Sequence, residues 1–221
     1  MLKAYKYRLY PNKEQEEYFS KCFGCVRFIY NRMLSDKIDY YKETKQKLNN
    51  TPAQYKKEFP WLKEVDSLAL ANTQMNLQTA YNNFFTRPET RFPNFKSKKN
   101  HYYSYTTNNQ KGSVSISDRY IKLPKIGFVR IKKHRDFEGI IKSVTVSKNP
   151  SGKYYVSVLV NCEDQEKLLQ SNNKIGIDLG IKDFVITSEG EVFDNLHFKK
   201  SESKKIRKLQ KQLSRKQKGS N

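Results

Sequence analysis

The five residues Gly176-Ile-Asp-Leu-Gly180 place a single carboxylate at the centre of an apolar stretch that runs from Lys174 to Lys182. A carboxylate inside such a strand signal loses hydration, and a bound metal ion is one partner that offsets the loss. The alternative is an aspartate that turns the chain before Gly180 or caps a loop. The stretch therefore predicts a strand, with Asp178 as a candidate metal ligand.

The charge of the chain indicates a polyanionic partner. Lysine and arginine number 43 against 22 acidic residues, for a formal net charge of +21 and a pI near 9.8. A basic surface that neutralises phosphates gains free energy from counterion release. Of four consecutive blocks, only residues 136–198, which contain Asp178, are net acidic, and the blocks 91–135 and 199–221 beside it are strongly basic.

The apolar segments and the cysteines bear on the compartment. No stretch approaches the length of a membrane span, and the N-terminus has no signal-peptide core, so we expect no membrane and a reducing cytoplasm. Cys22 and Cys25 have CxxC spacing inside a helical pattern, and Cys162 stands alone. We favour packed cysteines over a redox or metal role, and we expect no zinc in this chain.

The first part of the chain predicts a strand and two helices. Residues 2–10 alternate as a strand, with Tyr7 on one face and Arg8 on the other. Asn12 begins a helix that runs toward residue 41, and its aromatic residues are interpreted as core. Residues 43–60 read as a loop because they are polar and broken by prolines. A second helix is expected from about Ser67 to Phe85.

Two polar segments are candidates for nucleic-acid contacts. The second helix is rich in amides, including Asn72 and Gln74, which can hydrogen-bond to base edges, although solvated helix faces have the same composition. The basic loop 87–99 is followed by an aromatic run, a pattern suited to a nucleic-acid backbone. The alternative for this segment is an edge strand protected by lysines. The candidates here are Lys96, Lys98, Lys99 and Tyr103.

The remainder predicts strands and a final helix. Six short strands are expected between residues 101 and 162, and with the first strand they favour a small antiparallel barrel. Residues 163–173 read as a linker and domain boundary. Strands at 174–179 and 183–187 and an apolar group at 192–193 then begin an antiparallel meander. The basic helix expected at 201–218 supplies four further candidates for nucleic-acid contacts: Arg207, Lys208, Arg215 and Lys216.

Six segments in this order resemble the TnpB family, the transposon-associated, OrfB-type transposases that act as RNA-guided nucleases and are related to type V CRISPR effectors. The resembling segments are Lys3-Ala-Tyr-Lys-Tyr-Arg-Leu-Tyr-Pro11, Phe28-Ile-Tyr-Asn-Arg32, Ala80-Tyr-Asn-Asn-Phe-Phe85, Phe92-Pro-Asn-Phe-Lys-Ser-Lys98, Gly176-Ile-Asp-Leu-Gly-Ile-Lys182 and residues 209–221. They are spread across nearly the whole chain.

The resemblance implies an α+β fold with three parts. Residues 1–10 and 90–165 would form a wedge-type β-barrel, residues 11–89 an inserted helical recognition lobe, and residues 172–221 the first strands of a RuvC-like, RNase H-like domain with the start of a bridge helix. The implied partners are a guide RNA from the transposon end and a double-stranded DNA target, read mainly by base pairing. Asp178 matches the first catalytic carboxylate, which binds magnesium for phosphodiester hydrolysis.

The chain departs from the family pattern at its C-terminal end. The family carries a later glutamate, a later aspartate and a four-cysteine zinc site, and residues 1–221 contain none of these. We therefore expect an incomplete nuclease site that a C-terminal polypeptide would have to complete. Two alternatives stay open: a nuclease-dead, RNA-guided DNA-binding regulator, and a non-functional remnant.

Overall fold

The computed structural model describes residues 1–163 and 173–217, which belong to two compact units, Met1–Gln165 and Glu166–Asn221. The interior of the predicted linker and the last residue of the predicted final helix, Lys218, lie outside the described residues. Each unit contains both strands and helix, so the expected α+β class is confirmed for the described residues.

Unit 1 (Met1–Gln165) is built around an antiparallel sheet of seven strands in the order β2-β6-β7-β1-β5-β4-β3. The strands are β1 (Leu2–Tyr10), β2 (Tyr103–Asn108), β3 (Ser115–Ile116), β4 (Tyr120–Leu123), β5 (Gly127–Lys132), β6 (Ile140–Lys148) and β7 (Tyr154–Asn161). All seven predicted strands of this region are present. β1 lies between β7 and β5, so the N-terminal strand joins the two halves of the sheet. Closure into a barrel stays a prediction.

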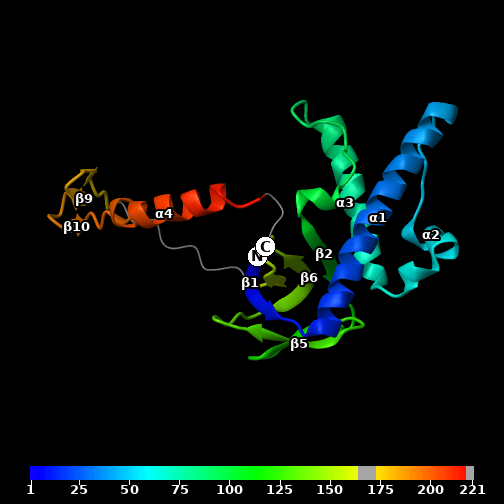
Figure 1. Ribbon diagram of the computed structural model, residues 1–221, viewed down its shortest axis with the longest axis horizontal. Helices are drawn as coiled ribbons and strands as arrows, with labels where there is room; N and C mark the ends of the chain where they lie inside the picture. Colours follow the sequence, from blue (N-terminus) through cyan, green and yellow to red (C-terminus); the bar gives the residue numbers. More distant parts are fainter. Residues whose placement is uncertain (164–172, 218–221) are drawn as a thin grey trace. The chain divides into compact units, whose positions relative to one another are not determined.

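Two long helices separate β1 from β2 in the chain (Figure 1). Helix α1 (Lys13–Thr44) begins with the predicted capping box, in which Asn12 and Gln15 each accept a backbone hydrogen bond from the other. Helix α3 (Ser67–Thr86) begins at Asp66, whose side chain accepts from the amide of Leu68. Both helices match the sequence prediction.

The loop predicted for residues 43–60 is wrong over its second half. The chain there forms helix α2 (Pro52–Glu58), followed by the short 3-10 helix η1 (Pro60–Lys63). Pro52 occupies the first turn of α2, where its missing N–H costs nothing. The hydroxyl of Tyr55 donates to Asp36 at 2.6 Å, and this partly buried contact holds the short helix against α1.

The core of unit 1 lies between α1 and one face of the sheet. The ring of Phe19 is fully buried and lies 6.2 Å from Tyr105 on β2 and 5.8 Å from Tyr154 on β7. Phe23 and Tyr30 are also buried, which confirms the core interpretation for these three aromatic residues of α1, whereas Tyr41 near its C-terminal end is exposed. Burial of such side chains contributes roughly 2 kcal/mol each, so this layer holds α1 against that face of the sheet.

Unit 2 (Glu166–Asn221) contains a small antiparallel sheet and one helix in its described part. The sheet has the order β10-β9-β8, from β8 (Ile177–Asp178), β9 (Asp183–Thr187) and β10 (Val192–Asp194), which is the predicted meander. β8 is shorter than predicted, because only two of its residues pair with β9. Helix α4 (Phe198–Ser214) begins three residues earlier than predicted. A 3-10 helix in unit 1, η2 (Lys98–Asn100), completes the described elements.

Candidate nucleic-acid interface

The face of the unit 1 sheet opposite its core carries a continuous set of basic and aromatic side chains. Alternation along β1 directs Tyr7 and Leu9 into the core and therefore directs Lys6, Arg8 and Tyr10 to the other face. The register places these side chains beside partners of the same kind on neighbouring strands. The two cross-strand rows are Tyr155–Arg8–Lys132 and Tyr10–Arg130–Tyr120. We call this set the basic sheet face.

Arg8 is the best-positioned cation of this face. Its guanidinium lies 5.1 Å from the ring centroid of Tyr155 and 5.5 Å from that of Tyr10. Lys6 adds a second cation 4.9 Å from the Tyr155 ring. The Nη1 atom of Arg8 is buried and donates no hydrogen bond within the described residues. A buried donor of this kind is expected to find an acceptor, and a phosphate oxygen fits its charge and geometry.

A hollow of about 850 Å³ lies beside Arg130 on this face. Its lining includes Tyr10, Arg119, Tyr120, Arg130 and Lys132. The remaining cation, Lys133, is already paired, with Asp136 and, at 3.6 Å, with Asp118. Its hydrogen bond to Asp136 is the main reason that the pKa of Lys133 is raised. Exposed arginines and tyrosines at the rim can neutralise phosphates and stack on bases.

The predicted contacts in the segment before β2 lie elsewhere on unit 1. Asn31 of α1 fixes the backbone of Lys96 through two hydrogen bonds, of 2.7 and 2.9 Å. The ammonium of Lys96 lies 4.1 Å from the ring centroid of Tyr30, where desolvation lowers the pKa of Lys96. Lys98 and Lys99 are exposed in η2. In strand order β6 and β7 separate this segment's strand, β2, from β1.

Three of the other predicted contact residues in unit 1 are engaged within the fold. The amide of Asn72 donates to the carbonyl of Leu68 at 2.9 Å, which is a local helix contact. The amide of Gln74 donates to the carbonyl of Asn50 at 3.2 Å. The ring of Tyr103 is half-buried and lies 6.0 Å from Phe23. These side chains do not form one surface with the basic sheet face, and their roles in binding stay predictions.

Asp178 lies on β8 of unit 2, opposite Ile186 of β9, and it is exposed. Gly180 follows in a tight turn, where an added Cβ would lie 2.8 Å from the carbonyl oxygen of Asp183. Within residues 1–163 and 173–217, no three His, Cys, Asp or Glu side chains gather closely enough to hold a metal ion. One exposed carboxylate is a single ligand, so the described residues do not fit a magnesium centre by themselves.

The basic helix predicted for the C-terminal part is present as α4. Arg207 and Lys208 lie on the helix, Arg215 is its C-terminal cap, and Lys216 follows it. All four side chains are exposed. Their roles as phosphate contacts stay predictions.

The cysteines of α1 are buried, as expected of packed thiols. Burial raises the pKa of Cys22 to about 12 and that of Cys25 to about 11, so both stay protonated and unreactive at neutral pH. None of the three cysteines forms a disulfide. Among the described helices, none is long and apolar enough to cross a bilayer.

Sequence reasoning missed most of the basic sheet face. It placed Arg8 on the strand face opposite Tyr7 but did not extend the same alternation to β4 and β5. The missed residues are Tyr10, Tyr120, Arg130, Lys132 and Tyr155. The pair Lys122 and Phe128, which extends the face along β4 and β5, was missed as well. The signal that could have found them is the placement of basic and aromatic residues at every second position along each strand. The cross-strand register, which brings the rows together, is a property of the folded sheet.

A fold with a basic, aromatic sheet face defines a candidate nucleic-acid-binding protein, and comparison with known proteins identifies its family. Residues 1–46 match a family model described as "Helix-turn-helix domain" (HTH_OrfB_IS605), although in this chain they form β1 and α1. Residues 157–221 match a second, "Probable transposase" (OrfB_IS605). The chain belongs to the TnpB/OrfB family.

Two curated relatives align with essentially the whole chain. "Putative RNA-guided DNA endonuclease InsQ" of Escherichia coli is 32% identical over 228 residues, which cover 100% of this chain and 56% of the relative. "Putative RNA-guided DNA endonuclease" of Streptomyces pristinaespiralis is 31% identical and covers 99% and 56%. The chain therefore spans about half the length of these curated relatives.

A shorter relative and one solved structure complete the comparison. "Virulence protein VsdF" of Salmonella dublin is 36% identical over 113 residues, which cover 44% of this chain and 95% of that protein. A solved Cas12f1–sgRNA–target DNA complex matches with a TM-score of 0.42 and 11% identity, covering 97% of this chain and 62% of that one. A TM-score of this size does not define a common fold, and the family assignment rests on the sequence matches.

Proposed function

We propose that this chain is the guide-RNA- and DNA-binding portion of a TnpB-type RNA-guided DNA endonuclease, acting in the cytoplasm. The observation that carries the proposal is the basic sheet face, with Arg8 held between Tyr10 and Tyr155 and its Nη1 donor unpaired among the described residues. Two relatives named as RNA-guided DNA endonucleases along the whole length of the chain support it.

Each part of the chain has a role in this proposal. Residues 1–10 and 90–165 act as a wedge-type barrel that grips the guide RNA, and residues 11–89 act as a recognition lobe at the DNA. Residues 172–221 supply the first strands of a RuvC-like domain and a bridge helix. The guide RNA recognises the target DNA by base pairing. The protein neutralises the backbone phosphates, because cationic side chains on a sheet face bind phosphates of any sequence.

In the nuclease domain, Asp178 supplies one carboxylate of a magnesium centre. Magnesium, when bound, would activate water and stabilise charge at the scissile phosphate. In this proposal the other ligands come from a C-terminal polypeptide, because no three His, Cys, Asp or Glu side chains among the described residues gather closely enough to hold a metal ion. The Asp178 carboxylate lies at the end of β8, where it can accept a hydrogen bond or bind a cation. The tight turn at Gly180 brings the chain close to Asp183, the first residue of β9.

The basic sheet face can be tested by charge reversal. RNA that co-purifies with residues 1–221 is sequenced, synthesised, and titrated against the protein at several salt concentrations. Arg130→Glu with Lys132→Glu is expected to weaken binding at least tenfold and to flatten the salt dependence, because two phosphate contacts become repulsive. Both side chains are exposed, so the fold should persist.

A matched control makes the same change of net charge away from the face. Lys57 on α2 and Lys63 in η1 are exposed and form no ion pair within the described residues. Lys57→Glu with Lys63→Glu should reduce affinity less than threefold. Equal loss in the two double variants would show that overall charge, not the basic sheet face, binds the RNA. Absence of any co-purifying RNA, together with salt-independent binding, would contradict the proposal and favour a remnant.

A further inference from the structure

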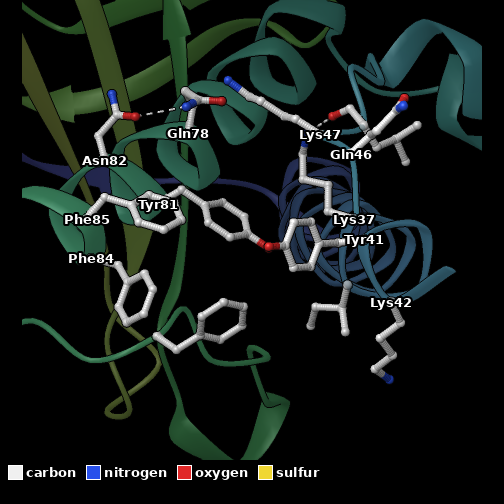
Figure 2. A pocket seen from close by; sticks show the side chains of 13 residues that line it. Lys37, Tyr41, Lys42, Gln46, Lys47, Gln78, Tyr81, Asn82, Phe84 and Phe85 are labelled. Atoms are coloured by element: carbon white, nitrogen blue, oxygen red, sulfur yellow. Dashed lines mark hydrogen bonds between the residues drawn. The ribbon is translucent and has the colours of Figure 1, made fainter. Parts of the chain in front are cut away.

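A second cavity in unit 1 lies between the C-terminal halves of α1 and α3, away from the strands of the basic sheet face. Its volume is about 510 Å³, which is within the range of small-molecule and nucleotide sites. Residues 46–48 close one side, and Phe92 from the segment after α3 closes another. Figure 2 shows Tyr41 from α1 and Tyr81 from α3 pointing into this space. We call it the aromatic cleft.

The walls of the aromatic cleft are rings that the core leaves uncovered. Phe92 packs edge-on against Tyr81, with ring centroids 5.6 Å apart, and against Phe84, at 5.3 Å. These perpendicular contacts hold the three rings in fixed positions. Tyr41 and Phe85 remain 57% and 75% exposed. An exposed ring beside a rigid aromatic wall offers a flat, preformed surface for another planar group.

The rim of the cleft is basic and contains no acidic lining residue. Lys37, Lys42 and Lys47 all line it. Lys37 donates to the carbonyl of Leu48 at 2.6 Å, and desolvation lowers the pKa of Lys37. Lys42 has a loose contact with Asp39, at 3.4 Å. Lys47 forms no ion pair or hydrogen bond with any residue that the structure describes, so its charge is available to a ligand.

Two amides complete the rim on the α3 side. The Nε2 of Gln78 donates to the Oδ1 of Asn82 at 2.9 Å (Figure 2). Gln78 is half-buried and Asn82 is exposed. The side-chain oxygen of Gln78 and the amide hydrogens that this bond does not use can pair with the edge of a planar polar ligand.

We propose that the aromatic cleft binds an unstacked base of a single-stranded nucleic acid, with Lys42 and Lys47 beside its phosphates. A nucleotide combines a flat ring, hydrogen-bonding edges and a negative charge, which match the aromatic wall, the amide pair and the lysine rim in turn. A purely aliphatic ligand would form no hydrogen bond or ion pair with the lysines. This inference rests on the proposed function, because it gives the same nucleic acid a second site on the protein.

The test compares single-stranded and double-stranded probes. Fluorescence anisotropy follows binding of a 15-nucleotide oligothymidine and of a blunt 15-base-pair duplex to residues 1–221. Phe85→Ala and, separately, Tyr41→Ala are expected to weaken single-strand binding about 10- to 100-fold, the loss typical of one stacked base, while duplex binding changes less than threefold. Lys47→Glu, which leaves the rings intact, should weaken single-strand binding about tenfold.

Met75→Ala is the matched control, because Met75 is 61% exposed on the same helix and does not line the cleft. It should leave both affinities unchanged, and circular dichroism confirms the fold of every variant. A 5-iodouracil probe gives an independent readout, since photocrosslinks are expected at Tyr41, Tyr81 or Phe85.

Three results would overturn the base site: unchanged single-strand affinity in both ring variants, equal loss for single strand and duplex, or crosslinks confined to other surfaces. A wild-type chain that binds neither probe overturns the proposed function as well. If an acidic, aromatic peptide bound the cleft and oligothymidine failed to displace it, the cleft would be a protein-docking site instead.

Discussion

The two units use apolar side chains in opposite ways. In unit 1 the apolar faces of α1, α3 and the sheet are joined in one buried core of 28 side chains. In residues 173–217 of unit 2 no residue is buried, and large apolar side chains such as Ile177, Leu179 and Phe198 are exposed. A short meander and one helix offer no second layer to cover these groups.

This contrast separates binding from catalysis. Binding needs only a rigid surface, which the sheet of unit 1 supplies through cross-strand rows fixed by its register. Two-metal hydrolysis needs carboxylates from several elements held within a fraction of an ångström. A single acid on an exposed two-residue strand is one ligand, so the described residues of unit 2 do not form such a centre by themselves.

The largest expected effect tests the contrast in burial. Phe19→Ala removes a fully buried ring and should lower the free energy of unfolding by roughly 4 kcal/mol. Ile177→Ala trims a side chain that is 62% exposed in unit 2 and should change it by less than about 0.5 kcal/mol. Urea titration monitored by circular dichroism measures both. A loss of several kcal/mol for Ile177→Ala would show that another surface covers the hairpin.

The sequence predicts elements that depend on neighbouring residues better than it predicts surfaces that depend on residues far apart in the chain. Strand alternation and the Asn12 capping box are local, and they located the seven strands of unit 1 and both long helices within a few residues. Helix α2 was missed because prolines read as loop signals, whereas Pro52 begins a helix that Tyr55 and Asp36 fix to α1. The basic sheet face was missed because its rows depend on cross-strand register.

Asp178 shows the same limit for the candidate site. The sequence located its strand, but whether an aspartate has companion ligands depends on how distant elements pack. Within the described residues none come near enough to hold a metal with it. The aromatic cleft was not anticipated either, since residues 41, 81 and 92 meet only through the packing of α1 against α3.

The second prediction uses pH to probe the core of unit 1. Burial raises the pKa of Cys22 from 9.0 to about 12, so the folded protein keeps a proton that the unfolded chain releases above pH 9. The contribution of this thiol to stability should therefore be constant below pH 9 and fall above it, by up to about 1.4 kcal/mol per pH unit. Urea titrations between pH 8 and pH 10, with a reducing agent, measure the slope.

The Cys22→Ala variant is the control for this pH dependence, because it removes the thiol from both states. This variant is expected to be less stable at every pH. Its stability should fall less steeply between pH 9 and pH 10, by up to about 1.4 kcal/mol per pH unit, because one fewer thiol releases a proton on unfolding. An identical slope in the two proteins would mean that the Cys22 thiol already ionises in the folded state, and that the core beside Tyr105 admits water.

The smallest expected effect concerns Asp178. Asp178→Ala should change the free energy of unfolding by less than about 0.5 kcal/mol, because the carboxylate is exposed and the strand pairing with Ile186 uses only backbone atoms. RNA affinity should also stay within twofold, whereas Arg130→Glu with Lys132→Glu lowers it at least tenfold. Incubation of residues 1–221 with guide RNA, target DNA and magnesium should yield no cleavage, with or without the substitution. Magnesium-dependent cutting that Asp178→Ala abolishes would show that the nuclease centre is complete within these residues, and that the hairpin of unit 2 gathers its ligands when nucleic acid binds.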